Sequence, residues 1–250
     1  MLRMSKGCIT FANKSDLFDY ERLANMAAAR VTKHLGLPVT ILTTDTAIDN
    51  IRTLPGNAGN FSWKNLGRTQ AYELSPYDRT LIIDADFFVA SDALLPHING
   101  SFEFGIIRDM YNPVTGEPFV PTLGYSKIQQ LWSTVMIFDK CDLSAKIFET
   151  ADNVLNHYPY YSKLYNFNPS PIRNDYAFTI ACHLMGGYGQ EDFSLKYTMN
   201  NCDFNAEILE VNDDDVLIHY PKGDKQMIQR LKNMDLHLQN KISLFECLNG

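Results

Sequence analysis

Two aspartates placed two residues apart carry the most specific chemical signal in this sequence. Asp84 and Asp86 follow the apolar run 81–83 and precede a second apolar run, 87–89. Ligands of open α/β sheets collect at the carboxyl ends of strands, and ionised carboxylates among apolar residues are costly to bury unpaired. A divalent cation that prefers oxygen ligands, Mn²⁺ or Mg²⁺, would pair them and could hold a diphosphate leaving group. The pair therefore predicts a metal site; the alternative is a turn capped by two aspartates.

A second candidate segment lies far along the chain. A strand expected over 216–219 ends in His219, and Lys222, Gly223 and Lys225 follow it. Imidazole suits transition metals such as Mn²⁺, glycine lets backbone N–H groups approach a phosphate, and lysine supplies a positive charge. A lone histidine at the end of a strand is usually structural, but the glycine and lysines that follow His219 favour a role as a metal ligand. We therefore predict that His219 completes the metal site and that Lys222, Gly223 and Lys225 bind phosphate.

The elements expected around these segments alternate between strands and helices. Strands are expected over residues 7–12, 39–43, 80–84, 102–108, 134–139, 193–198 and 216–219. Helices are expected over residues 19–35, 63–74, 143–157, 175–185 and 224–238, with irregular chain over 53–62, 110–124 and 158–171. The opening order of strand, helix and strand favours a parallel sheet with a right-handed crossover. The sequence thus predicts an α/β fold with a mixed, mostly parallel central sheet flanked by helices.

The expected loop over 158–171 is unusually aromatic. It contains four tyrosines, a phenylalanine and three prolines. Loops of this length in compact domains often act as lids or binding surfaces. Tyr160, Tyr161 and Tyr165 could form an acceptor surface, because flat aromatic faces suit sugar rings and bases. The alternative is a local cluster that folds inward.

Composition and charge narrow the function classes. The formal net charge of −7 disfavours broad electrostatic binding of nucleic acid; basic residues over 222–232 leave a local basic site open, or form a solvated helix face. The five cysteines contain no C-x-x-C pair, which indicates reduced thiols in a cytosolic setting. No secretory signal and no apolar run of about 18 residues is evident. We expect a cytoplasmic protein, bacterial or in a phage-infected host, with no membrane span and no obligate protein partner.

The two candidate segments together resemble the GT-A glycosyltransferases. The resemblance is closest to the retaining family, family eight, that includes glycogenin and bacterial lipopolysaccharide galactosyltransferases. In that family an aspartate pair and a late histidine bind Mn²⁺, and the histidine opens an H-x-x-G-x-x-K segment that contacts the diphosphate. Here the spacing from His219 through Gly223 to Lys225 is H-x-x-x-G-x-K. This departure leaves Lys222 and Lys225 as alternatives for the phosphate lysine.

The resemblance also implies a domain plan and further site residues. A single domain over 1–250 would have a nucleotide-binding half (1–110), a half that completes the metal and acceptor sites (111–225) and a helical tail (226–250). The residues matched to nucleotide binding are Phe11, Ala12, Asn13, Tyr20 and Ala85. Arg68, 16 residues before Asp84, matches a basic residue that reaches the donor sugar and phosphates. Asn174 and Asp175 match an amide and acid pair beside the donor sugar, with Arg173 as an alternative match.

Several of these matches have structural alternatives. Tyr20 could pack the start of a helix, Arg68 could lie on a helix surface, and Asp175 could favour a helix dipole whatever its function. The family has an Asn-Ala-Gly stretch in the sugar pocket where this sequence has Trp132, Ser133 and Thr134. That departure leaves the identity of the sugar open, and Trp132 could be a core residue.

The resemblance implies a hexosyl- or pentosyltransferase that uses Mn²⁺ or Mg²⁺ and a UDP-sugar, with retention at the anomeric carbon. The acceptor would be a glycan hydroxyl, or a hydroxymethylated pyrimidine in DNA if the chain is a phage enzyme. Two other function classes remain. A sugar-nucleotide pyrophosphorylase needs a glycine-rich loop after the first strand, and residues 13–16 contain no glycine. The second remaining class is a non-catalytic binding protein with a vestigial site.

Overall fold

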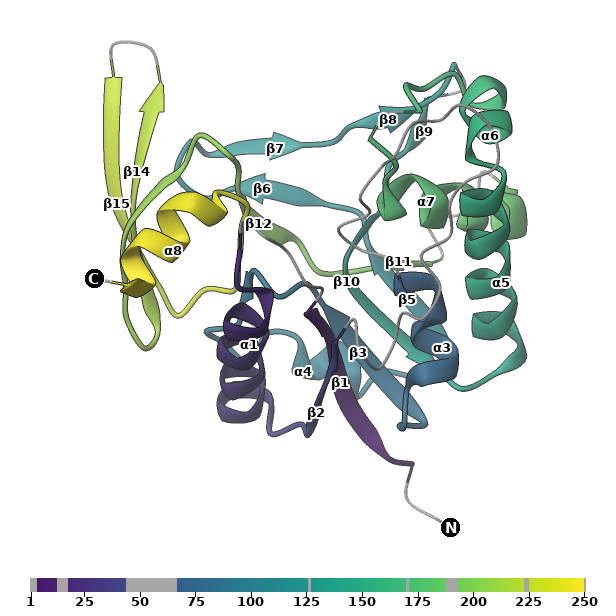
Figure 1. The fold of residues 1–250 in the computed structure, drawn as a ribbon, viewed down its shortest axis with the longest axis horizontal. Helices are drawn as coiled ribbons and strands as arrows, with labels where there is room; N and C mark the ends of the chain where they lie inside the picture. Colours follow the sequence, from purple (N-terminus) through teal and green to yellow (C-terminus); the bar gives the residue numbers. More distant parts are fainter. Residues whose placement is uncertain are drawn as a thin grey trace.

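The 250-residue chain has a mixed α/β fold in its computed structural model. The structure describes residues 4–12, 18–43, 67–125, 127–169, 171–187, 193–222 and 225–249. Helices pack against a central sheet whose strand pairs are mostly parallel, and smaller sheets stand beside it (Figure 1). The predicted fold class is therefore confirmed. None of the helices in the described ranges is long and apolar enough to cross a membrane.

The central sheet has six strands in the order β11-β5-β10-β3-β1-β2. They are β1 (Lys6–Ala12), β2 (Val39–Thr43), β3 (Arg79–Ile83), β5 (Phe104–Ile107), β10 (Trp132–Asp139) and β11 (Ser194–Leu195). β1 pairs in parallel with β2 and β3, and β11 with β5, whereas β10 runs antiparallel to β3 and β5. The first five of these strands were predicted from their apolar, β-branched runs. The carboxyl ends of β1 and β3 consequently lie next to each other.

The two faces of the central sheet are covered by different helices. Alternate side chains of a strand point to opposite faces, so Ile82 of β3 packs with α5 (Asp142–Asn156) and α7 (Asn174–Gly186), while Leu81 packs with α1 (Tyr20–Leu35). The short helices α4 (Leu95–Ile98) and α3 (Ala71–Leu74) complete these layers. All five residues of β3 are buried. This double cover explains the uninterrupted apolar run that precedes Asp84.

Helix α1 has a recognisable capping residue at each end. The Asp19 carboxylate accepts a hydrogen bond from the backbone N–H of Arg22 at 2.9 Å, which caps the helix. Gly36 follows the last turn with φ +64°, the left-handed conformation that glycine adopts without strain. The residues that α1 buries include Leu23, Ala27 and Val31, spaced at four.

Gly36→Ala is expected to lower the free energy of unfolding by about 1 kcal/mol, because a Cβ is disfavoured at positive φ. The added Cβ would meet nothing within 4 Å, so the cost is one of backbone conformation alone. Urea denaturation measures it. Gly36→Asn is the matched control, since asparagine tolerates this conformation better and should lose less. Equal stability of the alanine variant and the wild type would contradict the assignment of this cap.

Two smaller sheets lie beside the central sheet, and they include strands from the first part of the expected helical tail. A five-stranded sheet has the order β4-β16-β12-β6-β7, and a three-stranded sheet the order β13-β14-β15. The strands of the first are β4 (Phe87–Phe88), β16 (Leu236–Leu238), β12 (Met199–Cys202), β6 (Met110–Asn112) and β7 (Glu117–Phe119). Those of the second are β13 (Glu207–Val211), β14 (Asp215–Lys222) and β15 (Lys225–Lys232). The β14–β15 hairpin extends away from the central sheet (Figure 1), and α8 (Lys241–Asn249) packs against β13.

Several predicted elements are wrong in this part of the chain. The helix expected over 224–238 is instead β15 and β16, because β15 pairs with β14 along eight residues and sheet pairing overrides helix propensity. The basic cluster over 222–232 is therefore not a helix face. The strand expected over 193–198 is reduced to β11, and β13 was not predicted. The segment 110–124 contains β6, β7 and β8 (Thr122–Leu123), and β8 pairs with β9 (Ile128–Gln129).

The aromatic segment after residue 157 is partly helical. Helix α6 (Tyr158–Leu164) has Pro159 in its first turn, where proline is tolerated. Tyr158 and Tyr165 are buried and Tyr161 packs against the same core, whereas Tyr160 is exposed. The segment therefore forms mainly an inward cluster. Of the helix expected over 63–74, the described part contains the 3₁₀ turn η1 (Arg68–Gln70) and α3, and the loop expected over 53–62 lies outside the described residues.

Candidate functional site

Asp84 and Asp86 are fixed in a tight turn between two strands. Asp84 directly follows β3, and its backbone N–H donates to the carbonyl of Thr134 at 3.0 Å. The backbone N–H of Phe87 donates to the carbonyl of Asp84 at 3.0 Å, which closes the turn into β4. The Asp86 side chain is buried, and that of Asp84 is partly exposed. The backbone thus holds the two carboxylates on the same side of the sheet edge.

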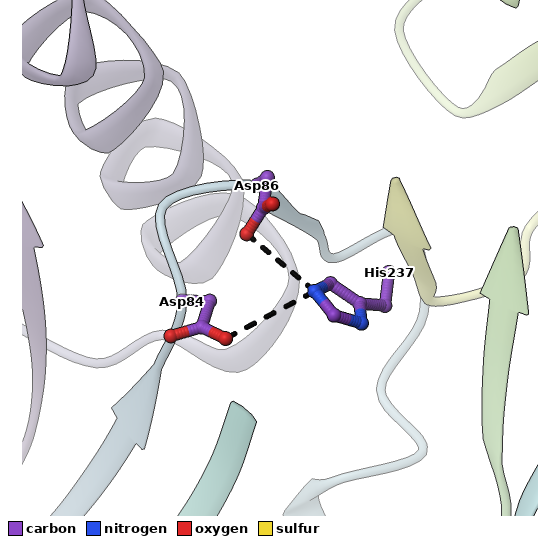
Figure 2. Close-up of side chains that lie close together, drawn as sticks. All are labelled: Asp84, Asp86 and His237. Atoms are coloured by element: carbon purple, nitrogen blue, oxygen red, sulfur yellow. Dashed lines mark ion pairs between the residues drawn. The ribbon is translucent and has the colours of Figure 1, made fainter. Parts of the chain in front are cut away.

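The third member of the group is His237, which β16 brings to the aspartates. β16 pairs antiparallel with β4, with His237 opposite Phe87. The imidazole Nε2 lies 3.9 Å from Oδ2 of Asp84 and 3.6 Å from Oδ1 of Asp86 (Figure 2). One ligand atom from each of the three residues lies within 4.8 Å of the others. Two carboxylates and an imidazole are a donor set that suits Mn²⁺ and related divalent ions.

The structure puts His237, and not His219, beside the aspartates. His219 lies on β14, where its Nδ1 is 2.7 Å from Oε2 of Glu207 on the neighbouring strand β13. The chain must pass through the β14–β15 hairpin before β16 returns to β4. His219 therefore belongs to the three-stranded sheet. The signal that sequence reasoning missed is the Leu-His-Leu alternation over 236–238, which fits a short strand with a polar side chain on one face.

Two basic side chains already pair with the aspartates. Lys241, the first residue of α8, places its Nζ 2.5 Å from Oδ2 of Asp86. Arg68 forms an ion pair with Asp84 and donates to the carbonyl of Ser133 at 3.0 Å. Burial would raise the pKa of Asp86, but the charges of Lys241 and His237 outweigh it and the pKa lies below the usual value. Burial lowers the pKa of the Arg68 guanidinium to about 10, so this side chain stays charged at neutral pH.

A cavity of about 400 Å³ opens over this group. Besides Asp84, Asp86 and His237, it is lined by six residues that sequence analysis selected: Phe11, Tyr20, Arg68, Ala85, Asn174 and Asp175. Arg68 is almost fully buried and is not a surface residue. Its guanidinium carbon lies 5.2 Å from the centre of the Phe11 ring. The fold thus brings together residues from the first strand, η1, the aspartate turn and α7.

Among the described residues, Ala12 and His219 were predicted to belong to the site but do not line this cavity. Ala12 is buried in a core cluster with residues of α1 and the C-terminal sheets. Asn13 and Gly223 lie outside the described residues, as do the side chains of Lys222 and Lys225. Sequence reasoning did not select Lys241 or Gln239, which line the cavity from the segment after β16. Both lie in the region that was predicted to be a helical tail, so the sequence offered no reason to place them beside the aspartates.

Asp175 is held in place at the start of α7. Its Oδ1 accepts hydrogen bonds from the backbone N–H and the hydroxyl of Ser133, both at 2.9 Å. Its Oδ2 lies 3.0 Å from a guanidinium nitrogen of Arg173. Ser133 is in β10, so these bonds join the first turn of α7 to the central sheet. These contacts fix the position of the Asp175 carboxylate at the cavity.

Comparisons with known proteins concern the fold. The sequence matches no family model and no curated protein. The apo form of the glycosyltransferase GlyE of Streptococcus pneumoniae is 11% identical with a TM-score of 0.38, over 80% of this chain and 47% of that one. Mouse xyloside xylosyltransferase 1 is 9% identical with a TM-score of 0.42, over 83% and 88%. The inositol-1-phosphate CTP transferase from T. maritima is 9% identical with a TM-score of 0.35, over 74% and 82%.

Proposed function

We propose that this protein is a metal-dependent glycosyltransferase of the GT-A type, which moves a sugar from a nucleotide diphosphate donor to an acceptor hydroxyl. The observation that carries the proposal is the group formed by Asp84, Asp86 and His237 at one wall of a cavity that Arg68 and Lys241 also line. An acid–imidazole metal group beside two cationic side chains suits a diphosphate better than a neutral ligand. The resemblance of the aspartate segment to family eight favours UDP as the nucleotide.

Each residue has a role in this proposal. Asp84, Asp86 and His237 would hold Mn²⁺ or Mg²⁺, which supplies Lewis-acid stabilisation of the diphosphate when bound. Arg68 and Lys241 neutralise charge that develops on the leaving group, a form of electrostatic stabilisation. Phe11 and Tyr20 offer aromatic faces to the base. Asp175, fixed by Ser133, supports positive charge at the anomeric carbon, and Asn174 beside it can donate to a sugar hydroxyl.

The transfer balances without a further reactant. The bond from the anomeric carbon to the diphosphate oxygen breaks, and the electron pair leaves with the diphosphate. The acceptor oxygen forms the new bond to the anomeric carbon, and its proton passes to an oxygen of the departing diphosphate. If the reaction follows the family that the sequence resembles, the configuration at the anomeric carbon is retained.

The expected result of a first test is a rise in melting temperature with UDP that requires Mn²⁺. A ligand that binds only the native state stabilises it by mass action, about 2.7 kcal/mol at a concentration one hundred times the Kd. Thermal denaturation with UDP, GDP, CDP and dTDP, each with Mn²⁺ or with EDTA, measures this effect. A shift with another nucleotide would change the donor class. The absence of any metal-dependent shift would contradict the proposed function.

A further inference from the structure

A second cavity lies beside the first and shares a wall with it. Its volume is also about 400 Å³. The residues that line both cavities are Trp132, Arg173, Phe204 and Gln239. Arg173 pairs with Asp175, so the shared wall is at the end of the first cavity where the donor sugar is proposed to lie. Phe11 and Tyr20, assigned to the base, line only the first cavity. A molecule in the second cavity would therefore lie near the sugar and away from the base.

The second cavity combines flat apolar faces with polar side chains. Phe119 at the end of β7 is 50% exposed, and its ring centre lies 5.7 Å from that of Trp132. Phe204 on the shared wall is 72% exposed. Carboxylate and amide groups of Asp203 and Asn201 stand among these rings. Exposed aromatic faces next to polar groups suit a sugar, whose ring has apolar C–H faces and a rim of hydroxyls.

The charges around the second cavity oppose a phosphate-bearing ligand. Glu117 and Asp203 line it, and the one basic residue among its described lining residues, Arg173, already pairs with Asp175. The pKa of the Tyr220 hydroxyl is raised by burial, by its hydrogen bond to Asp203 and by the charges of Asp203 and Glu117. Such a surface repels the backbone of a nucleic acid. The chemistry therefore favours a neutral sugar over a base in DNA.

We propose that the second cavity is the acceptor site and that the acceptor is a neutral sugar. Its ring packs against Phe119 and Phe204, and its hydroxyls bond to the carboxylate of Asp203 and the amide of Asn201. The role as acceptor rests on the glycosyltransferase function proposed above. Binding of the sugar itself does not, because the second cavity and its aromatic rings are independent of the metal group.

The first experiment measures binding without any donor. The chain has two tryptophans, so a Trp63→Phe variant leaves Trp132 as the sole tryptophan, which is excited selectively at a wavelength that tyrosine does not absorb. Methyl glycosides of glucose, galactose and mannose are titrated against its emission, and at least one is expected to give a saturable change. Adding Phe119→Ala should raise the Kd for that glycoside by about tenfold. Tyr125→Ala is the matched control, because Tyr125 is 84% exposed and lines neither cavity. Saturation by no glycoside, or an unchanged Kd in the Phe119 variant, would overturn the proposal.

A second experiment separates this inference from the proposed function. Labelled UDP-sugars are incubated with Mn²⁺ and either the bound glycoside or a single-stranded oligonucleotide containing hydroxymethylcytosine. We expect transfer to the glycoside, and a ratio of transfer to donor hydrolysis that falls about tenfold in Phe119→Ala. Transfer to the oligonucleotide alone would overturn the neutral-sugar acceptor. If the wild type turns over no donor, the proposed function fails, and the Trp132 titration still decides whether the cavity binds a sugar.

Discussion

His237→Ala is expected to lower Mn²⁺-dependent turnover of a UDP-sugar by at least about a hundredfold, whereas His219→Ala retains most of the activity. The imidazole of His237 lies within 4 Å of carboxylate oxygens of both aspartates, so its removal takes away one ligand of the metal group. His219 instead pairs with Glu207, whose side chain is about half exposed, and the loss of that pair should cost less than about 1 kcal/mol.

Isothermal titration of Mn²⁺ into both variants provides the direct comparison. Circular dichroism and urea denaturation serve as controls that each variant is folded. His237→Ala should bind Mn²⁺ much more weakly than the wild type, and His219→Ala should bind it with nearly the same Kd. If the two variants exchange these results, the metal group would be completed by His219. If neither variant loses affinity, the assignment of a metal site to this group would be wrong.

Lys241→Met is expected to destabilise the metal-free protein by about 3 kcal/mol, because it leaves the buried carboxylate of Asp86 without its closest cation. The same substitution should increase the stabilisation that Mn²⁺ provides, since the ammonium and the metal compete for the same carboxylate. Urea denaturation in EDTA and in Mn²⁺ measures both effects. Equal stabilisation by Mn²⁺ in the variant and in the wild type would show that Lys241 does not compete with the ion.

The pH dependence of this difference follows from the lowered pKa of Asp86. A carboxyl group with a lowered pKa in the folded protein contributes stability above its unfolded pKa and loses it as the pH falls through the folded value. The gap between wild type and Lys241→Met should thus be full at pH 7 and shrink below about pH 4. Lys146→Met is the control, because its exposed pair with Glu149 should change stability by less than about 0.5 kcal/mol.

The sequence predicted the half of the site that depends on local pattern. The run that forms β3 is apolar on both faces, so its end and the aspartate pair could be located without any knowledge of its neighbours. Arg68 and Asp175 were found by their resemblance to a family motif and their spacing from other segments. Both now lie on the same cavity wall as Asp84. Motif spacing sufficed for Arg68 and Asp175 although Arg68 lies in the three-residue turn η1 and Asp175 in the first turn of α7.

The other half of the site depends on pairing that short segments do not encode. β16 has only three residues, and β15 is a run with good helix formers that becomes a strand because β14 lies beside it. Without that pairing, residues 224–238 fit a helix. His237 then falls in the last turn of that helix, where nothing marks it as a metal ligand. Lys241 was missed for the same reason. Tertiary partners, and not local propensity, decide the conformation of this region.

The pairing of β16 with β4 has a consequence during synthesis of the chain. His237 is made 151 residues after Asp86, so at ordinary rates of translation it follows the aspartates by about 8–30 s. A nascent chain can form the early strands of the central sheet in that interval, but it has only two of the three residues of the metal group. Under the proposed function, capture of the ion by all three residues must wait until β16 has left the ribosome, which would tie activity to a late step of folding.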